Sequence, residues 1–362
     1  MKKKLKSISK DLKTMPLNNK TNNHKYTGVG LDIGNYSIKA AGIKKQPLAK
    51  KGTLSFAIEY LPENATPEQK CESIRKVLEK AGINEKKVNI SICGPNVITR
   101  YIRLPFMRSY ELQDAIELEW DKYISLKKDE VVWDYTVLNI SKDAKAKFAQ
   151  VLLVAVKKDI IEARIGLLKA AGLEPKAINI DSLALASVFN FVNPAKAKQP
   201  VLILNIGEYF TNEVIIKNNI CWFSRDINIG GHDITSIIAD RLHLKLAEAE
   251  NLKCGLGEAR KEEVYKLIQP VLDNLINEVK LSVEYLMKEL AEDVRLIYIF
   301  GGSARLFNLD NYLSHALGIP IRKWSLAEAF SLSPKITPEA IKKNSPDLAV
   351  AVGLALTKKD AF

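Results

Sequence analysis

The sequence feature that most constrains the fold is a strand-and-glycine pattern that occurs twice. Residues 30–34 read Gly-Leu-Asp-Ile-Gly, and residues 203–207 read Ile-Leu-Asn-Ile-Gly. In both, an apolar strand ends in a short polar residue, an isoleucine and a glycine, and a second strand with a hydroxyl residue, Ser37 or Thr211, follows. The repeat predicts two related α/β halves with an internal pseudo-two-fold axis. Chance similarity between short apolar strands is the alternative.

The size and composition favour a folded chain of more than one domain. Its 362 residues are 47% hydrophobic and 27% charged, which is ample for a core. No apolar run approaches the roughly 20 residues needed to span a bilayer, and the start lacks the apolar segment of a secretory signal. The cysteines form no CxxC pair and the histidines no metal-ligand cluster. We therefore expect reduced core thiols in the cytosol and no metalloenzyme.

The net charge of +12 is concentrated at the N-terminus. Residues 1–27 carry eight lysines and one acid, which leaves +5 for the rest of the chain. Apolar residues between Leu5 and Met15 lie three and four apart, so this segment could form a basic amphipathic helix on an anionic membrane. Pro16 and the asparagines after it favour a solvated, flexible extension instead. Because the charge belongs to this tail and not to a groove across the fold, we expect no nucleic-acid partner.

Hydrophobic periodicity and turn residues predict the elements. The predicted strands are 30–33, 37–43, 88–93, 99–104, 131–140, 148–156, 201–206, 211–216, 220–224 and 296–300. The predicted helices are 67–81, 111–123, 159–171, 233–243, 264–289, 309–317 and 347–356. Gly82 and Gly172 are predicted to end helices, and Asn218–Asn219 suits a type I′ hairpin turn.

Both glycine turns are candidates for phosphate binding. A tight glycine turn can point successive backbone N–H groups at an anion, and Gly34 and Gly207 let the backbone approach it closely. The hydroxyl residues after them could add donors, and Lys39 could add positive charge. Asp32 is placed to hold Mg²⁺, through water, because Mg²⁺ keeps several waters.

A third motif, Gly301-Gly302-Ser303-Ala304-Arg305, follows the strand predicted over 296–300 and precedes a helix. The glycine pair leaves room for a flat base or a ribose against the backbone, and a helix N-terminus favours an anion. A tight turn with a purely structural role is the alternative.

Together and in this order, the three motifs resemble the phosphate 1, phosphate 2 and adenosine elements of the actin/Hsp70/hexokinase superfamily. Within it, the chain from about Gly28 to Lys358 resembles the PilM family, cytoplasmic actin-like proteins of type IV pilus assembly that are related to FtsA. The similarity is carried by GLDIGNYSIK from Gly30, ELQDAIELEWDKYI from Glu111, VAVKKDIIEARIGLLKAAGLEPKAINID from Val154, NEVKLSVEY from Asn277 and GGSARL from Gly301.

The resemblance implies an α/β, actin-like (ribonuclease H-like, duplicated) fold with two lobes and an FtsA-type 1C subdomain. The expected domain order is a basic extension 1–27, domain 1A 28–87, subdomain 1C 88–158, domain 1A 159–199, domain 2A 200–235, subdomain 2B 236–294, domain 2A 295–338 and a return to domain 1A 339–362.

The resemblance also implies ATP and Mg²⁺ as ligands. Asp32 is expected to hold the metal, and Asp181 is expected to position the attacking water, which makes these two the candidate catalytic residues. The residues expected to bind nucleotide are Gly34, Asn35, Ser37, Lys39, Gly207, Glu208, Thr211, Glu250, Lys253, Gly301, Gly302, Ser303 and Arg305.

One residue departs from the family pattern. The family usually has Asp at the phosphate 2 position, where this chain has Asn205. An amide cannot supply the negative charge that helps to hold Mg²⁺ and orient water, and phosphoryl transfer depends on such placement. We therefore expect nucleotide binding to survive and hydrolysis to be weak or absent.

The resemblance further implies an adaptor on the inner face of the inner membrane. Its expected partners are the N-terminal segment of a PilN-type protein, the PilN/PilO complex and the pilus motor ATPases, with peripheral membrane association and self-association left open. The candidate groove residues, within Val88–Leu104 and Val151–Val156, fit an ordinary strand core equally well.

Three alternatives remain. A metabolic kinase of the superfamily needs a carboxylate base at a substrate pocket, and only Asp181 is a candidate. An FtsA-like division or filament protein would end in an amphipathic membrane helix, whereas this chain stops at Phe362. A scaffold that resembles the cytoplasmic part of GspL would continue into a transmembrane helix.

Overall fold

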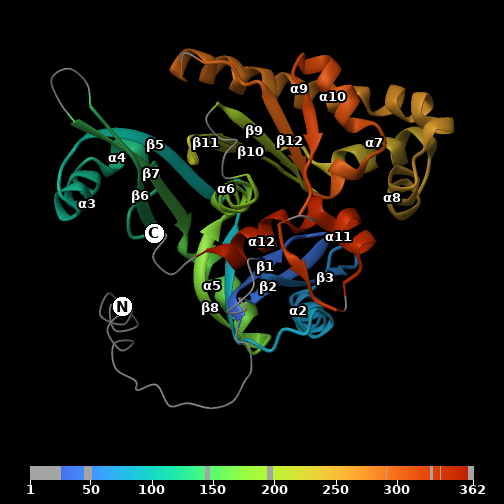
Figure 1. Ribbon diagram of the computed structural model, residues 1–362, viewed down its shortest axis with the longest axis horizontal. Helices are drawn as coiled ribbons and strands as arrows, with labels where there is room; N and C mark the ends of the chain where they lie inside the picture. Colours follow the sequence, from blue (N-terminus) through green and yellow to red (C-terminus); the bar gives the residue numbers. More distant parts are fainter. Residues whose placement is uncertain are drawn as a thin grey trace.

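The computed structural model describes residues 26–44, 51–142, 147–193, 199–290, 292–326, 329–334 and 336–357 (Figure 1). The extension predicted over residues 1–27 lies outside these ranges, except for Tyr26 and Thr27, which already belong to the first strand. None of the described helices is long and apolar enough to cross a membrane.

The first lobe is built on a six-stranded sheet that carries the first glycine hairpin, with strand order β14-β3-β2-β1-β4-β8. The strands are β1 Tyr26–Ile33, β2 Ser37–Lys44, β3 Thr53–Tyr60, β4 Lys87–Ile92, β8 Glu174–Ile180 and β14 Ser331–Leu332. β1, β2 and β3 are antiparallel neighbours, whereas β4 runs parallel to β1 and to β8. On one face, α2 (Pro67–Ala81) and α5 (Lys158–Ala170) cover an aliphatic core.

Helix α2 shows how local sequence sets the element ends. Thr66 and Gln69 form a reciprocal capping box and Pro67 occupies the first turn, so the first N–H groups are satisfied or absent. Gly82 ends the helix with φ of 66°, a conformation that favours glycine. Both predicted ends of this helix are confirmed.

The second lobe is built on a five-stranded sheet that carries the second glycine hairpin, with strand order β11-β10-β9-β12-β13. Its strands are β9 Val201–Ile206, β10 Thr211–Lys217, β11 Ile220–Ile227, β12 Leu296–Phe300 and β13 Ile321–Lys323. The outer helices are α7 Gly231–Leu242, α8 Leu246–Cys254, α9 Lys261–Leu290 and α10 Leu309–Leu317, with short 3-10 turns η1 Glu258–Arg260 and η2 Gly302–Arg305. Asn218 and Asn219 have φ of 52° and 63°, which confirms the predicted hairpin turn.

Two helices lie between the large sheets and join the lobes into one core (Figure 1). They are α6 (Asp181–Val192) and α12 (Ala349–Leu356), the latter preceded by α11 Pro338–Asn344 and η3 Ser345–Leu348. α12 packs backbone to backbone, since a Cβ on Gly30 would lie 2.0 Å from the Ala351 carbonyl oxygen. The Asn89 amide donates to the Leu354 carbonyl (2.8 Å) near the C-terminal end of α12.

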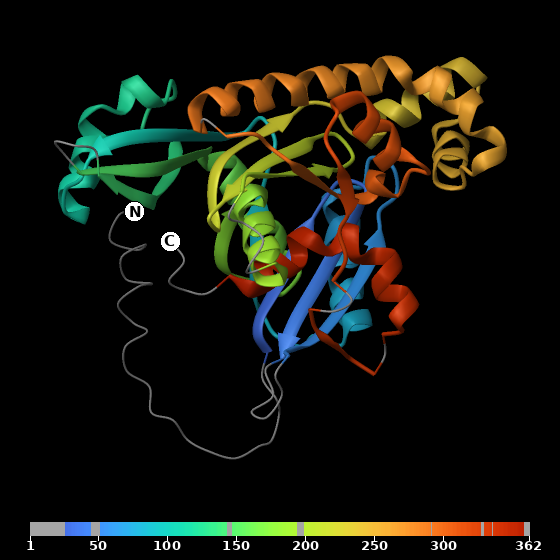
Figure 2. The ribbon, with the colours of Figure 1, turned by 45° about the horizontal axis from the view of Figure 1, so that its top comes forward.

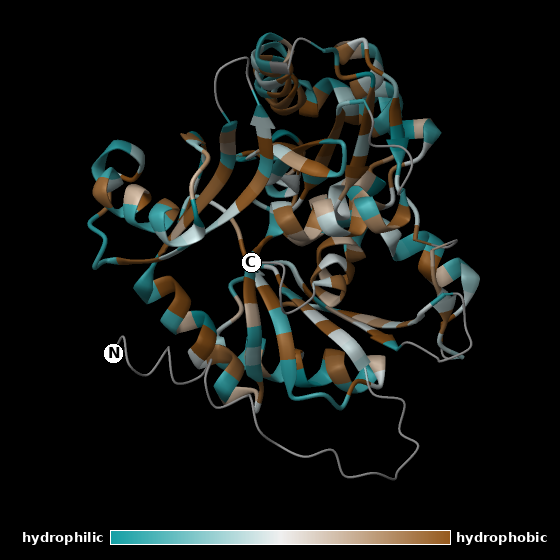
Figure 3. Ribbon diagram, turned by 60° about the vertical axis from the view of Figure 1, so that its left-hand side comes forward, coloured by the Kyte–Doolittle hydropathy of each residue, from teal (hydrophilic) through white to brown (hydrophobic). Residues whose placement is uncertain are grey.

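A third sheet projects from the side of the molecule (Figure 2). It consists of β5 Val97–Pro105, β6 Val131–Lys142 and β7 Lys147–Lys157 in the order β5-β7-β6, all antiparallel. Helices α3 (Ser109–Leu118) and α4 (Trp120–Tyr123) cover its own small core. Figure 3 shows apolar residues concentrated on the strands and on the helices between the sheets, which places the cores there.

Several predicted boundaries shift. The helix predicted over 111–123 is divided at Glu119 into α3 and α4. β4 pairs with β1 and β8, so the boundary expected at residue 88 lies instead in the β4–β5 turn, and the boundary at 235/236 falls inside α7. β14, expected in domain 2A, pairs with β3 of the first sheet. Apolar strand patterns do not reveal which sheet a strand joins, because the pairing partners are distant in sequence.

Candidate functional site

The two glycine hairpins meet where the lobes face each other. Burial is the main reason why the pKa of Glu208, in the second hairpin, is raised, and the positive charges of His232, Lys253 and Lys39 act against it. Lys39 belongs to the first hairpin, so charged groups of both hairpins lie close enough to influence one another. That the two hairpins meet on one ligand stays a prediction of the duplicated pattern.

The first hairpin presents a charge pair. Asp32 ends β1 beside Lys39 on β2, with Oδ2 and Nζ 3.2 Å apart. Burial acts to lower the pKa of Lys39, but the carboxylates of Asp32 and Asp347 outweigh it, so the pKa is raised and the amine is charged. In the turn, the Gly34 N–H donates to the Ser37 carbonyl at 3.2 Å, Asn35 is exposed and Ser37 is buried.

The second hairpin is held by hydrogen bonds from the start of α7. The Gly231 and His232 N–H groups at the start of α7 donate to the Gly207 and Glu208 carbonyls, both at 2.8 Å. One Glu208 carboxylate oxygen is buried and has no hydrogen-bond partner among the described residues. Such an atom fits a site that a ligand or water completes.

Thr211 does not face the cleft, so its expected contact with phosphate is wrong for the side chain. It is fully buried, and its hydroxyl donates to the Ile229 carbonyl at 2.8 Å. The residue therefore anchors the loop before α7. The sequence shows that a hydroxyl follows the turn, but not which side of the hairpin it occupies.

Close backbone approaches form a cradle beside the second hairpin. A Cβ on Gly301 would lie 2.3 Å from the Ile206 carbonyl oxygen, and its φ of 86° also favours glycine. A Cβ on Gly231 would lie 2.3 Å from Ser303 Oγ and 3.2 Å from Lys253 Nζ. These glycines bring polar groups of three elements together, an arrangement that fits a nucleotide.

The expected ribose-binding pair lies in an internal network. Lys253 is buried, and its ammonium reaches the Gly231 carbonyl (3.0 Å), the Thr235 hydroxyl (2.8 Å) and Glu250 Oε2 (2.6 Å). Because an ammonium has three N–H donors, this set uses all of them. Burial acts to raise the pKa of Glu250, but Lys253 outweighs it and the carboxylate stays ionised. Lys253 therefore positions Glu250 and the α7 N-terminus.

The Gly301–Arg305 motif forms a 3-10 turn, η2. The helix predicted to follow it over 309–317 is confirmed as α10, so the N-terminus of that helix lies beyond the motif and not at the glycine pair. Within the motif, Ser303 Oγ lies 3.4 Å from the Gly207 carbonyl, and an Arg305 guanidinium nitrogen lies 3.2 Å from the Asp347 carboxylate. The motif thus reaches both the second hairpin and the C-terminal η3.

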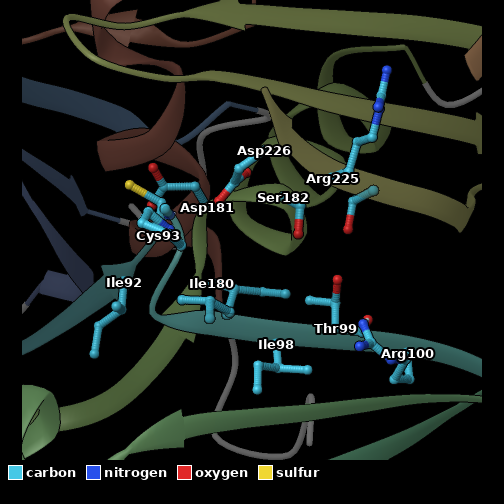
Figure 4. A pocket seen from close by; sticks show the side chains of 14 residues that line it. Ile92, Cys93, Ile98, Thr99, Arg100, Ile180, Asp181, Ser182, Arg225 and Asp226 are labelled. Atoms are coloured by element: carbon cyan, nitrogen blue, oxygen red, sulfur yellow. Dashed lines mark hydrogen bonds between the residues drawn. The ribbon is translucent and has the colours of Figure 1, made fainter. Parts of the chain in front are cut away.

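A cavity of about 210 Å³ lies between the β4–β5 turn with the start of β5, the start of α6 and β11, and Asp181 is one of the residues that line it (Figure 4). Asp181 begins α6, as expected, and lies beside Cys93 and Asp226. Burial, followed by the negative charge of Asp32, raises the pKa of Asp181 to about 6. In the described part of the chain, no three His, Cys, Asp or Glu side chains cluster closely enough to hold a metal. Mg²⁺ would therefore need phosphate and water ligands beside any carboxylate.

Asn205 lies at the end of β9, and its amide donates to the Asn212 carbonyl oxygen at 2.7 Å. It is 9% exposed, so this bond is shielded from solvent. Asn205, which stands where the family usually has a metal-binding Asp, is thus also a hydrogen-bond donor in the sheet.

Sequence reasoning missed several residues of the cleft. They are Asn212, Asp226, Gly230, Gly231, His232, Thr235, Asp347 and the edge-to-face pair Tyr36 and Tyr60, whose ring centroids lie 5.5 Å apart. The Gly230–Gly231 pair before a predicted helix resembles the glycine pair of the third motif and could have been noticed. The expectation of core thiols holds for Cys71 and Cys221, whereas Cys93 and Cys254 are exposed.

Comparison with known sequences adds a family and two relatives. The family model described as "Type IV pilus assembly protein PilM" matches residues 30–359. The ethanolamine utilization protein EutJ of Escherichia coli (strain K12) is 23% identical over 210 residues, covering 52% of this chain and 64% of that protein. EutJ of Salmonella typhimurium (strain LT2) is 22% identical with the same coverage. The chain thus spans just under two thirds of the length of these relatives.

Comparison with solved structures shows the actin-like fold. A chain of the structure described as "PilM-PilN type IV pilus biogenesis complex" matches with a TM-score of 0.81 and 26% identity, over 91% of this chain and 98% of that chain. EutJ of Carboxydothermus hydrogenoformans gives 0.52 with 15% identity, over 95% and 92%. MreB5 of Spiroplasma citri bound to ADP gives 0.50 with 13% identity, over 90% and 94%.

Proposed function

The chain belongs to the PilM family of type IV pilus assembly proteins, and we propose that it acts there as an ATP-binding adaptor for the N-terminal segment of a PilN-type membrane protein. The observation that carries the proposal is its likeness to 98% of a chain from a PilM–PilN complex. The further partners of such an adaptor would be the PilN/PilO complex and the motor ATPases, at the inner face of the inner membrane.

The cleft supports ATP as the ligand. The first hairpin would meet the phosphates with the Lys39 ammonium and the backbone around Gly34, and the second with the backbone at Gly207. Glu250 and the Gly301 motif would hold the nucleoside, with Lys253 behind Glu250. Asp32 would meet Mg²⁺ through water. Bound ATP and Mg²⁺ would supply a polyanion and a cation that both lobes can contact at once.

Hydrolysis is proposed to be weak. Asp181 takes up a proton near pH 6 and so has the basicity of a water-positioning group. The second hairpin, however, offers the neutral Asn205 where a carboxylate would complete the charge arrangement. Single-turnover measurement with the purified chain tests this, and brisk ATP hydrolysis would contradict it.

A switch is the proposed use of the nucleotide. The lobes share one core around α6 and α12. They would contact the nucleotide from opposite sides, which suits a hinge or shear closure. ATP would then favour the lobe arrangement that it contacts best, and the partner would sense which arrangement is populated.

The partner segment is proposed to bind beside β6. Within the groove residues expected from the sequence, side chains such as Val151 and Leu153 are fully buried in the core. β6, in contrast, is an edge of its sheet and borders a second cavity of about 230 Å³. Its lining is Thr136, Val137, Leu138, Asn179, Leu183, Ala186, Ser187, Asn190, Asn219, Ile220, Cys221 and Thr357. An open strand edge beside an apolar cavity suits an extended peptide.

The experiment is a titration of the full chain with a labelled peptide of the PilN-type N-terminal segment, with and without ATP–Mg²⁺. Val137→Asp should weaken peptide binding at least tenfold and leave ATP affinity unchanged. Val132→Asp, on the same strand and also exposed but outside the cavity lining, is the matched control. Equal peptide affinity with and without ATP–Mg²⁺ would refute the switch, and equal affinity in both variants would refute the site.

A further inference from the structure

A chain of hydrogen bonds crosses the second sheet from the glycine hairpin to the entry of the third sheet, buried at its first link and partly buried at the other two. The Asn205 amide donates to Asn212 Oδ1 at 2.7 Å, and the Asn212 amide donates to Asp226 Oδ1 at 2.7 Å. Asp226 Oδ2 accepts the backbone N–H of Gly94 at 2.6 Å. Four residues on three neighbouring strands and one turn are therefore joined end to end, and we refer to them as the relay.

The donors and acceptors of the relay allow one direction only. A carboxylate accepts but cannot donate, so Asp226 requires the Asn212 side chain to present its NH₂ group. The Asn212 side-chain carbonyl then faces Asn205, which must donate to it with its own NH₂ group. The charge of Asp226 thus fixes the orientation of an amide two strands away, beside the second glycine hairpin.

The far end of the relay is the turn that leads into β5. Gly94 adopts a φ of 87°, and a Cβ there would lie 3.0 Å from the Phe210 ring, which belongs to the second hairpin. Further along β5, the Tyr101 hydroxyl lies 3.0 Å from Ser224 Oγ on β11. The β4–β5 turn therefore rests on the second hairpin, and β5 starts from it.

We propose that Asp226 is the positioning residue through which the second glycine hairpin controls the β4–β5 turn, and with it the third sheet. This rests on the proposed function, because it assigns the route by which a nucleotide in the cleft reaches the partner-binding sheet. A nucleotide that moves Asn205 has to move Asn212 and Asp226 with it or break a hydrogen bond of the relay, and an unpaired buried group is costly. The relay would thereby couple the position of the second glycine hairpin, with or without nucleotide, to the position of the β4–β5 turn.

The first test compares full-length wild type with Asp226→Ala, and with Tyr101→Phe as the control that removes the other hydrogen-bonded tie between β5 and β11. Two quantities are measured in each. One is hydrogen exchange at residues 94–100 with and without ATP–Mg²⁺, and the other is the ratio of peptide affinities in the two conditions. The exchange measurement needs no partner and no hydrolysis.

The expected outcome is a wild-type affinity ratio of about fivefold or more, typical of coupled sites, with slower exchange at the β4–β5 turn when ATP is bound. Asp226→Ala should reduce the ratio below about twofold and abolish the exchange response, while Tyr101→Phe keeps both. A ratio that survives in Asp226→Ala, or is lost equally in Tyr101→Phe, would overturn the relay but leave the switch intact. The absence of any ATP effect in wild type would refute both.

A charge exchange tests the direction of the relay without relying on truncation. Asn205→Asp alone sets two acceptors against each other, because Asn212 can donate toward only one carboxylate. Adding Asp226→Asn reverses the direction of the relay. The amide NH₂ at position 226 then donates to the Asn212 carbonyl oxygen, and the Asn212 NH₂ donates to the carboxylate at position 205. The carbonyl oxygen at position 226 still accepts the Gly94 N–H. The single variant should melt at least several degrees below wild type, and the double variant should recover most of that loss. No recovery in the double variant would overturn the proposed direction.

Discussion

The two glycine hairpins have the same backbone and opposite chemistry. In the first, Asp32 and Lys39 form an ion pair at the cleft. In the second, the positions that match Asp32 and Lys39 are Asn205 and Asn212, and these two neutral side chains are hydrogen-bonded to each other. One hairpin offers charge to a ligand, whereas the other offers backbone and holds the lobe together. Duplication of a fold therefore does not imply duplication of the site's chemistry.

The difference has a physical cause in what surrounds each strand end. Lys39 pairs with Asp32, and the negative charges of Asp32 and Asp347 raise the pKa of its amine against the effect of burial and keep it charged. Asn205 is surrounded by other hydrogen-bonding side chains of its sheet. The second hairpin should therefore be sensitive to packing, and the first to charge.

The largest expected effect follows from packing at the second hairpin. Gly301→Ala would place a Cβ 2.3 Å from the Ile206 carbonyl, in a left-handed backbone conformation. We expect a loss of several kcal/mol in unfolding free energy and no measurable ATP binding. Gly318→Ala is the matched control, because Gly318 is also left-handed but has no atom within 4 Å of the added Cβ. It should cost only about 1 kcal/mol. Equal urea midpoints for the two variants would contradict the packing argument.

Charge at the first hairpin comes next. Lys39→Met removes the ammonium that faces Asp32 and Asp347. ATP affinity should fall about 10- to 100-fold, the range expected for a charge-assisted hydrogen bond. Lys51→Met, at a lysine outside the first hairpin, should leave ATP affinity unchanged. Isothermal titration of both variants measures the difference, and an unchanged affinity in Lys39→Met would show that the first hairpin does not supply the charge.

The acid at the start of α6 gives a pH signature. Since the pKa of Asp181 is raised to about 6, the folded chain holds a proton that the unfolded chain releases from about pH 4. This contribution makes stability fall as pH rises from about 4 to 6, by about 3 kcal/mol, and remain level above. Asp181→Asn should remove this slope, whereas Asp121→Asn, an exposed acid on α4, should keep it. Urea unfolding across this range decides the matter, and an unaltered slope in Asp181→Asn would contradict the assignment.

The smallest expected effect concerns the Thr211 hydroxyl. Thr211→Val should leave the Ile229 carbonyl without its donor and cost about 1–2 kcal/mol of stability. ATP affinity should change less than twofold, because the hydroxyl points away from the cleft. Thr211→Ser, which keeps the hydroxyl, serves as the control. A large loss of ATP affinity in Thr211→Val alone would restore the phosphate contact expected from the sequence.

The sequence predicts the repeated hairpins and most element ends because these depend on local signals. Thr66, Pro67 and Gly82 set the ends of one helix, and paired asparagines make one hairpin turn. It does not reveal that β4 joins the first sheet, that Thr211 faces inward, or that Asp226 reaches Gly94, because each depends on partners far away in the chain. The family resemblance supplies the fold, and the side-chain environment then decides which equivalent residues keep an equivalent role.

The central claim is that both hairpins contact one nucleotide, and hydrogen exchange with ATP–Mg²⁺ tests it most directly. Binding should slow exchange in residues 32–39 and in residues 205–211 together, with a single affinity for both segments. Protection of only one segment, or of neither at a saturating concentration of ATP–Mg²⁺, would contradict the account.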